Sequence, residues 1–227
     1  MLIDYFEPNK IGNDYVFGDI HGMYDYFKYC LDKLNFDKTK DRVFCVGDLI
    51  DRSAENLQMM ALLNEDWFFS VMGNHEQMFC EYMTGEIDQH AYFYNGGEWT
   101  IIFPHDTLLP YYNIVKKLPI IIQVGNVGIV HADINYTYWN DFKEAIKDER
   151  NIANAIWGRN RISRHIENNI IGIDKVILDH AVLSYPQELG NTLYIDTGCV
   201  FKQRLTCYNI NSDETTSFEY EDWLNNV

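Results

Sequence analysis

Apolar and polar positions alternate regularly along the first third of the chain. Short apolar runs at residues 14–17, 42–46 and 67–72 are each followed by a few polar residues and then by a stretch with one apolar helical face. This rhythm is typical of βαβ units, in which the strands are parallel. The pattern therefore predicts three parallel strands, each followed by a helix. The expected helices span residues 23–34, 54–63 and 77–83.

The remaining two thirds change character. Residues 91–118 are rich in aromatic side chains and predict helix with a turn near Phe103 and Pro104. Two apolar runs flank Gly125 and Asn126 and predict a hairpin. The last fifty residues carry short apolar runs between turns, which predict strands. We therefore expect a mixed α/β fold with a β-rich second half. No repeat or linker divides the chain, so residues 1–227 are predicted to form a single domain.

Composition places the chain among ordinary folded proteins and disfavours some partners. It has 227 residues, of which 47% are apolar and 23% charged, a formal net charge of −16 and a pI of about 4.7. This charge repels a polyphosphate backbone, so no nucleic-acid partner is expected. A small phosphorylated substrate stays compatible with it, because a metal and a few arginines can reverse the field locally.

Cysteine usage and the absence of long apolar runs indicate the compartment. The five cysteines are odd in number, form no C-x-x-C pair and mostly have apolar neighbours, as in a reducing compartment. The first residues lack the apolar core of a signal peptide, and no run approaches the ~18 residues of a membrane span. The sequence predicts a cytoplasmic protein with no membrane partner.

Polar side chains stand at the ends of five predicted strands, the edge where open α/β sheets bind ligands. Buried charges are costly unless they are paired or bind a metal. Mixed carboxylate, imidazole and amide ligands suit Mn²⁺, Fe or Zn²⁺, whereas an all-oxygen shell suits Ca²⁺ or Mg²⁺. The residues are Asp19, His21, Asp48, Asp51, Arg52, Asn74, His75, His131 and His180.

Each of these residues has an ordinary explanation when it is taken alone. Asp19 and His21 could meet by accident, Asp48 could cap a helix, and His131 or His180 could be a hydrogen-bonded core histidine. The coincidence of all five strand ends, in order, favours a metal site. His90, His105 and His165 lie outside such positions and are expected to be surface or structural residues.

Three segments, GDIHG, GDLIDR and GNHE, resemble in order and spacing the signature of the serine/threonine phosphoprotein phosphatases, a family of metallophosphoesterases. Further segments, including NGGEW, VHAD, IWGRNRI and LYIDTGCVF, are similar to the bacteriophage lambda type of this family. The likeness extends from about Tyr15 to Ile210. It implies a sandwich of two β-sheets flanked by helices, with a dinuclear metal site at the strand ends.

The resemblance also implies the ligands of two divalent metal ions, with Mn²⁺ as the first expectation and Fe or Zn²⁺ as alternatives. The Asp-x-His pair serves the first metal, and the aspartate of the second motif bridges both. The asparagine of the third motif and two later histidines serve the second metal. The expected ligands are Asp19, His21, Asp48, Asn74, His131 and His180.

Four further residues receive roles from the same resemblance. Arg52 would bind two phosphate oxygens, and the second phosphate-binding arginine falls on Arg159, with Arg161 as a competitor two residues away. His75, oriented by Asp51, would act as the general acid. A metal-bridging hydroxide would attack phosphorus directly, so that no phosphoenzyme forms.

The expected function is therefore hydrolysis of phosphoserine and phosphothreonine in phosphoproteins or phosphopeptides, with phosphotyrosine and small phosphoesters as secondary substrates and no regulatory subunit. A symmetrical dinucleoside tetraphosphate hydrolase shares the three motifs and is the nearest rival. A non-catalytic phosphopeptide-binding relative would have lost Asp51, His75 or an arginine, and all are present. A nuclease is disfavoured by the acidic charge.

The chain departs from the family pattern in two places. Ser53 replaces the glycine that ends the second motif. It either adopts a left-handed backbone conformation, at a cost in free energy, or caps a helix beginning at residue 54 or 55. His180 lies in LDHAVL where the lambda type has GHTP, so Asp179 either supports a ligand histidine or faces solvent. Glu76 is expected to be a structural hydrogen-bonding group.

Overall fold

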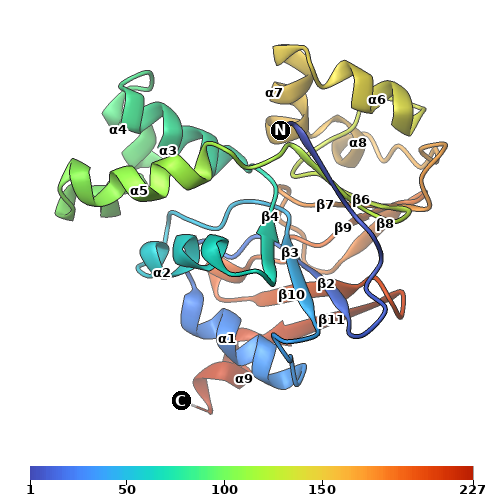
Figure 1. The fold of residues 1–227 in the computed structure, drawn as a ribbon, viewed down its shortest axis with the longest axis horizontal. Coiled ribbons are helices and arrows are strands. Elements are labelled where there is room, and N and C mark those ends of the chain that lie inside the picture. The colour runs from blue at the N-terminus through green and yellow to red at the C-terminus, as the bar shows by residue number, and fades with distance from the viewer. Residues whose placement is uncertain (227) are drawn as a thin grey trace.

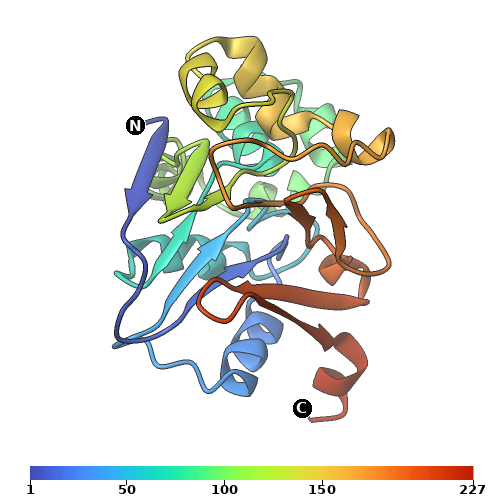
Figure 2. The same ribbon diagram turned by 90° about the vertical axis from the view of Figure 1, so that its right-hand side faces the viewer.

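Two β-sheets lie face to face in the computed structural model, which describes residues 1–226 (Figures 1 and 2). The first has the order β11-β10-β2-β3-β4 and the second the order β1-β5-β6-β7-β9-β8. The first contains β2 (Asp14–Phe17), β3 (Arg42–Cys45), β4 (Phe68–Ser70), β10 (Arg204–Asn209) and β11 (Glu214–Glu219). The second contains β1 (Ile3–Phe6), β5 (Ile121–Val124), β6 (Val127–Ile129), β7 (Lys175–Leu178), β8 (Gln187–Leu189) and β9 (Thr192–Tyr194).

Strand pairing confirms the expected parallel core. β2, β3 and β4 are parallel neighbours, and the turn at Gly125 and Asn126 joins β5 and β6 as an antiparallel pair. The C-terminal strand β10 lies between β2 and β11 and is antiparallel to both, so that Cys207 pairs with Phe17. A strand near the C-terminus therefore pairs with β2, the strand of this sheet that comes first in the sequence.

The unbroken apolar runs arise because both faces of each sheet are buried. Side chains alternate along β2, so Val16 enters the core between the sheets while Tyr15 and Phe17 pack under the outer helices. In β3, Phe44 likewise lies between the sheets and Val43 packs under the outer helices. Three apolar layers result: one between the sheets and one outside each of them. This is the predicted two-sheet sandwich flanked by helices.

Helices cover the outer face of each sheet and form two lobes above the sandwich (Figure 1). Beside the first sheet are α1 (Tyr24–Lys33), α2 (Asn56–Ala61), η1 (Leu62–Asn64) and α9 (Tyr220–Leu224). One lobe holds α3 (Asn74–Thr84), α4 (Gln89–Tyr94), η2 (Gly97–Ile102) and α5 (His105–Val115). The other holds α6 (Trp139–Ala145), α7 (Glu149–Trp157) and α8 (Asn160–Ser163). Among residues 1–226, no helix has the length and apolar character needed to cross a membrane.

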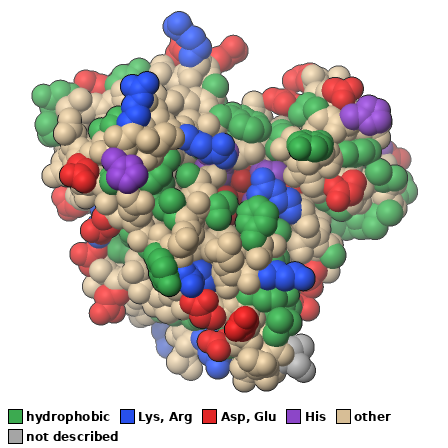
Figure 3. Space-filling view, turned by 180° about the vertical axis from the view of Figure 1, so that it is seen from behind, with side chains coloured by type: hydrophobic (Ala, Val, Ile, Leu, Met, Phe, Trp, Pro, Cys, Tyr) green, Lys and Arg blue, Asp and Glu red, His purple; other side chains and the backbone are tan. Residues whose placement is uncertain are grey.

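The second half is β-rich, as expected, and the lobe of α6, α7 and α8 adds helices to it that the sequence did not indicate. Single contacts of two tryptophans anchor this lobe. Trp139 is fully buried and lies directly over Gly128, where an added Cβ would come within 2.5 Å of its ring. Trp157 donates from Nε1 to Oε1 of Gln77 at 2.9 Å, which joins the two lobes. The opposite face of the molecule shows a hollow between them (Figure 3).

Candidate metal and phosphate site

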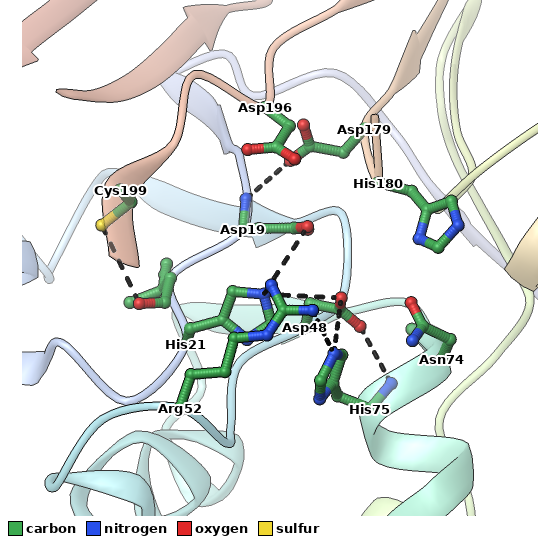
Figure 4. Close-up of polar contacts among 12 residues, drawn as sticks. Asp19, His21, Asp48, Arg52, Asn74, His75, Asp179, His180, Asp196 and Cys199 are labelled. Carbon is green, nitrogen blue, oxygen red and sulfur yellow. Dashed lines mark hydrogen bonds and ion pairs between the residues drawn. The ribbon is translucent and has the colours of Figure 1, made fainter. Parts of the chain in front are cut away.

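The predicted polar residues meet where the loops after β2, β3, β4, β6 and β7 converge (Figure 4). Apart from the exposed Arg52, their side chains are buried although they are polar: Asp48 is 2% exposed, and His75 and His131 are fully buried. Asp48 lies at the centre. One group of possible ligand atoms comes from His21, Asp48 and His75, and a second from Asp48, His131 and His180, each within 4.8 Å. His90, His105 and His165 are exposed, as expected.

Backbone carbonyls fix the orientation of two imidazoles. His21 donates from Nδ1 to the carbonyl of Ile50 at 2.8 Å, and His131 donates from Nδ1 to the carbonyl of Val46 at the same distance. Their Nε2 atoms then face Asp48, at 3.7 Å from Oδ2 and 3.5 Å from Oδ1, respectively. A carbonyl partner on one ring nitrogen is the usual support of a histidine that binds metal through the other.

Unsatisfied polar atoms test whether the cluster fits a metal. Among the described residues, Oδ1 of Asp19 and Nε2 of His180 are buried and have no hydrogen-bond partner. Buried polar atoms rarely lack a partner, and each such atom calls for an explanation. A cation between the carboxylates and imidazoles would satisfy both atoms. The mixed oxygen and nitrogen donors fit Mn²⁺, Fe or Zn²⁺.

Protonation also favours a cation. Burial opposes ionisation of Asp48, but the facing imidazoles of His131, His75 and His21 outweigh it and hold the pKa of Asp48 below its usual value. Burial lowers the pKa of His21, and burial together with His131 lowers that of His180 to about 3. Asp48 is therefore ionised while His21 and His180 are neutral, the forms in which these groups bind metal.

Arg52 lies between two of the imidazoles. Its Nη1 donates to Nε2 of His21 at 3.0 Å and its Nη2 to Nε2 of His75 at 2.9 Å. Because guanidinium is only a donor, both Nε2 atoms must accept. The ring of Phe201 lies 5.9 Å from the guanidinium carbon, within cation–π range. A cationic side chain therefore lies beside the imidazoles of His21 and His75.

Both expectations about Ser53 are wrong. The left-handed residues of this turn are Asp51 and Arg52, with φ of 73° and 68°, whereas Ser53 has no positive φ. Helix α2 begins at Asn56, without a side-chain cap. Asn56 instead closes the turn: its Oδ1 accepts from the amide of Asp51, and its Nδ2 donates to the carbonyl of Ser53, both at 2.7 Å.

The pair formed by His75 and Asp51 has two supports that sequence reasoning missed. His75 Nδ1 lies 2.7 Å from Oδ2 of Asp51. On the other oxygen, the hydroxyl of Tyr92 donates at 2.9 Å and the indole of Trp99 at 2.7 Å. Trp99 belongs to the NGGEW segment, and the carbonyl of Gly96 in the same segment accepts from the amide of Arg52 at 3.0 Å. That segment was the only sequence signal for this contact.

Glu76 binds backbone amides, as expected of a structural group. Its Oε2 accepts from the amides of Asp48 at 2.7 Å and Gly73 at 3.0 Å, and its Oε1 accepts from the amide of Leu49 at 2.8 Å. The carboxylate therefore joins the loop after β3 to the start of α3. It fixes the backbone on which Asp48 is carried.

Glu76→Ala is expected to destabilise the protein by at least about 3 kcal/mol, because three buried amides would lose their acceptor at roughly 1–3 kcal/mol each. The measurement is chemical denaturation followed by fluorescence. Glu81→Ala, on the same helix, is the control, because its carboxylate bonds only the side chain of Gln77. Its effect should stay within about 0.5 kcal/mol. Equal losses in both variants would contradict the assigned role of Glu76.

The two candidate phosphate-binding arginines have different surroundings. Arg161 is 5% exposed, and its Nη1 donates to the carbonyls of Ile166 at 2.8 Å and Asn168 at 2.9 Å. It is committed to the backbone. Arg159 is exposed and makes one weak bond, from Nη2 to the carbonyl of His180 at 3.4 Å. Arg159 is thus the arginine available to a ligand.

Asp179 neither faces solvent nor supports His180. It is 1% exposed, and its Oδ2 accepts from the amide of Asp19 at 2.6 Å. Asp196, which the sequence did not single out, lies beside it behind Asp19 (Figure 4). Burial and the neighbouring carboxylates raise the pKa of Asp19 and Asp179 well above the usual value. A bound cation would offset the repulsion among these neighbouring acidic groups.

Comparisons with known proteins identify relatives over most of the chain. The family model described as calcineurin-like phosphoesterase matches residues 15–224. "Serine/threonine-protein phosphatase 2" of Salmonella typhimurium (strain LT2) is 32% identical, covering 86% of this chain and 92% of its own. The protein of the same name from Escherichia coli (strain K12) is 34% identical with the same coverage. A crystal structure of a proposed diadenosine tetraphosphatase shares the fold, with a TM-score of 0.70 and 19% identity over 95% of this chain and 97% of its own.

Proposed function

The chain belongs to the calcineurin-like phosphoesterase family, and we propose that it is a metal-dependent phosphatase that hydrolyses phosphoserine and phosphothreonine in proteins. The observation that carries this proposal is the buried Asp48 faced by the imidazoles of His21, His75 and His131 with Arg52 beside them. Such a cluster would bring a metal and a phosphate group together at one place. The relatives that match most of the chain bear the name of serine/threonine-protein phosphatases.

Six side chains would hold two divalent cations in this proposal. Asp48 would contribute to both cation sites, because its carboxylate belongs to both groups of possible ligands. When bound, the cations would supply an activated water nucleophile and neutralise charge on the phosphoryl oxygens. We propose Mn²⁺ first, and the donor set fits Fe or Zn²⁺ equally. The six residues are Asp19, His21, Asp48, Asn74, His131 and His180.

Arg52 is proposed to change partner when the site is loaded. Nε2 of His21 cannot accept from Arg52 and bind a cation at once, so metal binding would release one arm of the guanidinium. The freed fork can then bind two oxygens of a phosphate. Arg159 would bind the same group from the segment between α7 and α8. Both arginines also offset the acidic charge of the chain where the substrate enters.

His75 is proposed to give a proton to the departing serine or threonine oxygen. Burial lowers the pKa of His75, but the charge of Asp48 and the hydrogen bond and charge of Asp51 outweigh it, so the pKa lies above its ordinary value. Nδ1 is bound to Asp51, which leaves Nε2 to carry the transferred proton once Arg52 turns toward phosphate. An alkoxide is a poor leaving group, so this proton lowers the barrier.

The substrate class is tested by offering the metal-stripped protein Mn²⁺, Zn²⁺ or Mg²⁺ in turn, with a phosphoserine peptide and diadenosine tetraphosphate at equal concentrations. The expected result is Mn²⁺-dependent release of phosphate from the peptide at a higher kcat/KM than cleavage of the dinucleotide. Faster cleavage of the dinucleotide would overturn the proposal and favour the nucleotide-hydrolase alternative. A cytoplasmic location and the lack of a regulatory subunit remain predictions.

A further inference from the structure

Asp133 is a fully buried carboxylate that the proposed chemistry leaves without a role. It follows His131 by two residues, on the loop after β6. Its Oδ2 accepts from the amide of Asn160 at 2.7 Å and from that of Arg161 at 3.3 Å, and its Oδ1 accepts from the amide of Ile134 at 2.8 Å. One carboxylate therefore joins the loop that carries His131 to the first turn of α8.

Arg159 has few contacts of its own. Its guanidinium is exposed, and within residues 1–226 its one hydrogen bond is that of 3.4 Å to the carbonyl of His180. Its backbone, in contrast, is fixed on both sides by Asp133. The two following amides bind the carboxylate, and at Gly158, just before Arg159, an added Cβ would lie 2.6 Å from Cβ of Asp133 and 2.5 Å from the carbonyl of Asn154.

We propose that Asp133 is a positioning residue that sets the place of Arg159 for phosphate binding, an inference that rests on the proposed function. An ionised carboxylate that accepts amide bonds makes stronger and shorter contacts than a neutral acceptor. Because these contacts lie on both sides of Arg159 in the chain, they fix the position of its α-carbon, from which the side chain extends. A displacement of about 1 Å in such a group can cost about 100-fold in function.

The test compares Asp133→Asn with Asp148→Asn in the full chain. Both carboxylates accept backbone amides at the start of a helix in the same lobe, but Asp148 binds the amide of Arg150, away from the site. Inorganic phosphate is the probe, measured as a competitive inhibitor and by calorimetry. Asp133→Asn is expected to raise the inhibition constant and the peptide KM by about 10-fold with a smaller change in kcat, and Asp148→Asn to change neither.

Two further measurements separate positioning from simple damage. In an Arg159→Ala background, Asp133→Asn should add no further loss of phosphate affinity, because both changes remove the same contact. Bound metal per chain should equal that of the parent. Asp133→Ser, which keeps one acceptor oxygen, is the second variant if Asp133→Asn does not fold, and the same direction is expected.

Three outcomes would overturn the inference: unchanged phosphate affinity in the folded variants, losses that add to those of Arg159→Ala, or loss of bound metal, which would place the effect at His131. The proposed function can fail separately. A parent protein that binds phosphate but releases none from peptides would overturn the phosphatase proposal, and calorimetry with inorganic phosphate would still decide the role of Asp133.

Discussion

His75→Asn is expected to lower kcat for a phosphoserine peptide by about 10²- to 10⁴-fold, the usual contribution of general acid catalysis. The imidazole is held at 2.7 Å from Asp51, whose other oxygen is fixed by Tyr92 and Trp99. Asparagine keeps a polar side chain in this pocket but has no proton to give at neutral pH. Steady-state kinetics with saturating Mn²⁺ would measure the loss.

The leaving group distinguishes loss of an acid from loss of structure. Nitrophenolate departs without a proton, so p-nitrophenyl phosphate should lose much less activity than the peptide in His75→Asn. His165→Asn is the control, because His165 is exposed and its left-handed φ of 50° suits asparagine. It should behave as the parent. Equal losses on both substrates would argue that His75 has a role other than proton donation.

Mn²⁺ is expected to stabilise the metal-stripped protein strongly. Free metal at 100 times Kd adds about 2.7 kcal/mol per site to the free energy of unfolding. For a chain of this size, about 1 kcal/mol corresponds to a shift of about 2–4 °C in Tm, so one filled site should raise Tm by about 5–10 °C. The physical source is the buried carboxylates and the unpartnered atoms of Asp19 and His180. Scanning calorimetry against metal concentration checks this.

Asp48→Asn should remove most of that stabilisation, because the amide replaces the carboxylate that belongs to both groups of possible ligands. Metal bound per chain, measured by elemental analysis after gel filtration, should fall with it. Asp106→Asn on the exposed first turn of α5 is the control and should keep the full shift. A shift in Asp48→Asn equal to that of the parent would mean that the cation binds elsewhere.

The sheet and its polar edge could be predicted because their signals are local. Val16 and Phe17 face opposite cores, so the whole of β2 must be apolar, and the same holds for β3. Strand direction then brings the ends of β2 and β3 to one edge, with Asp19 and Asp48 on it. The regular alternation of strand and helix in the sequence is enough to predict both the buried strands and their common edge.

The supporting contacts could not be predicted because they join distant segments. Tyr92 and Trp99 reach Asp51 across 41 and 48 residues of chain, and Asp133 meets Asn160 across 27. Nothing local marks the partners. The turn at Asp51 and Arg52 was misjudged for a different reason. The side chain of the nearby Asn56 closes it, so the left-handed residues lie before Ser53. The short helices α6 and α8 carry too little periodicity to be recognised.

The place of β10 has a consequence for the protein during its synthesis. β2 carries Asp19 and His21 at its end, and its neighbour β10 includes Cys207, which pairs with Phe17. The amide of Gly18 likewise donates to the carbonyl of Thr206 at 3.1 Å. In a nascent chain, β2 therefore cannot pair with β10 until residues 204–209 have left the ribosome. We expect Asp19 and His21 to reach their final places only then, because they follow directly on β2.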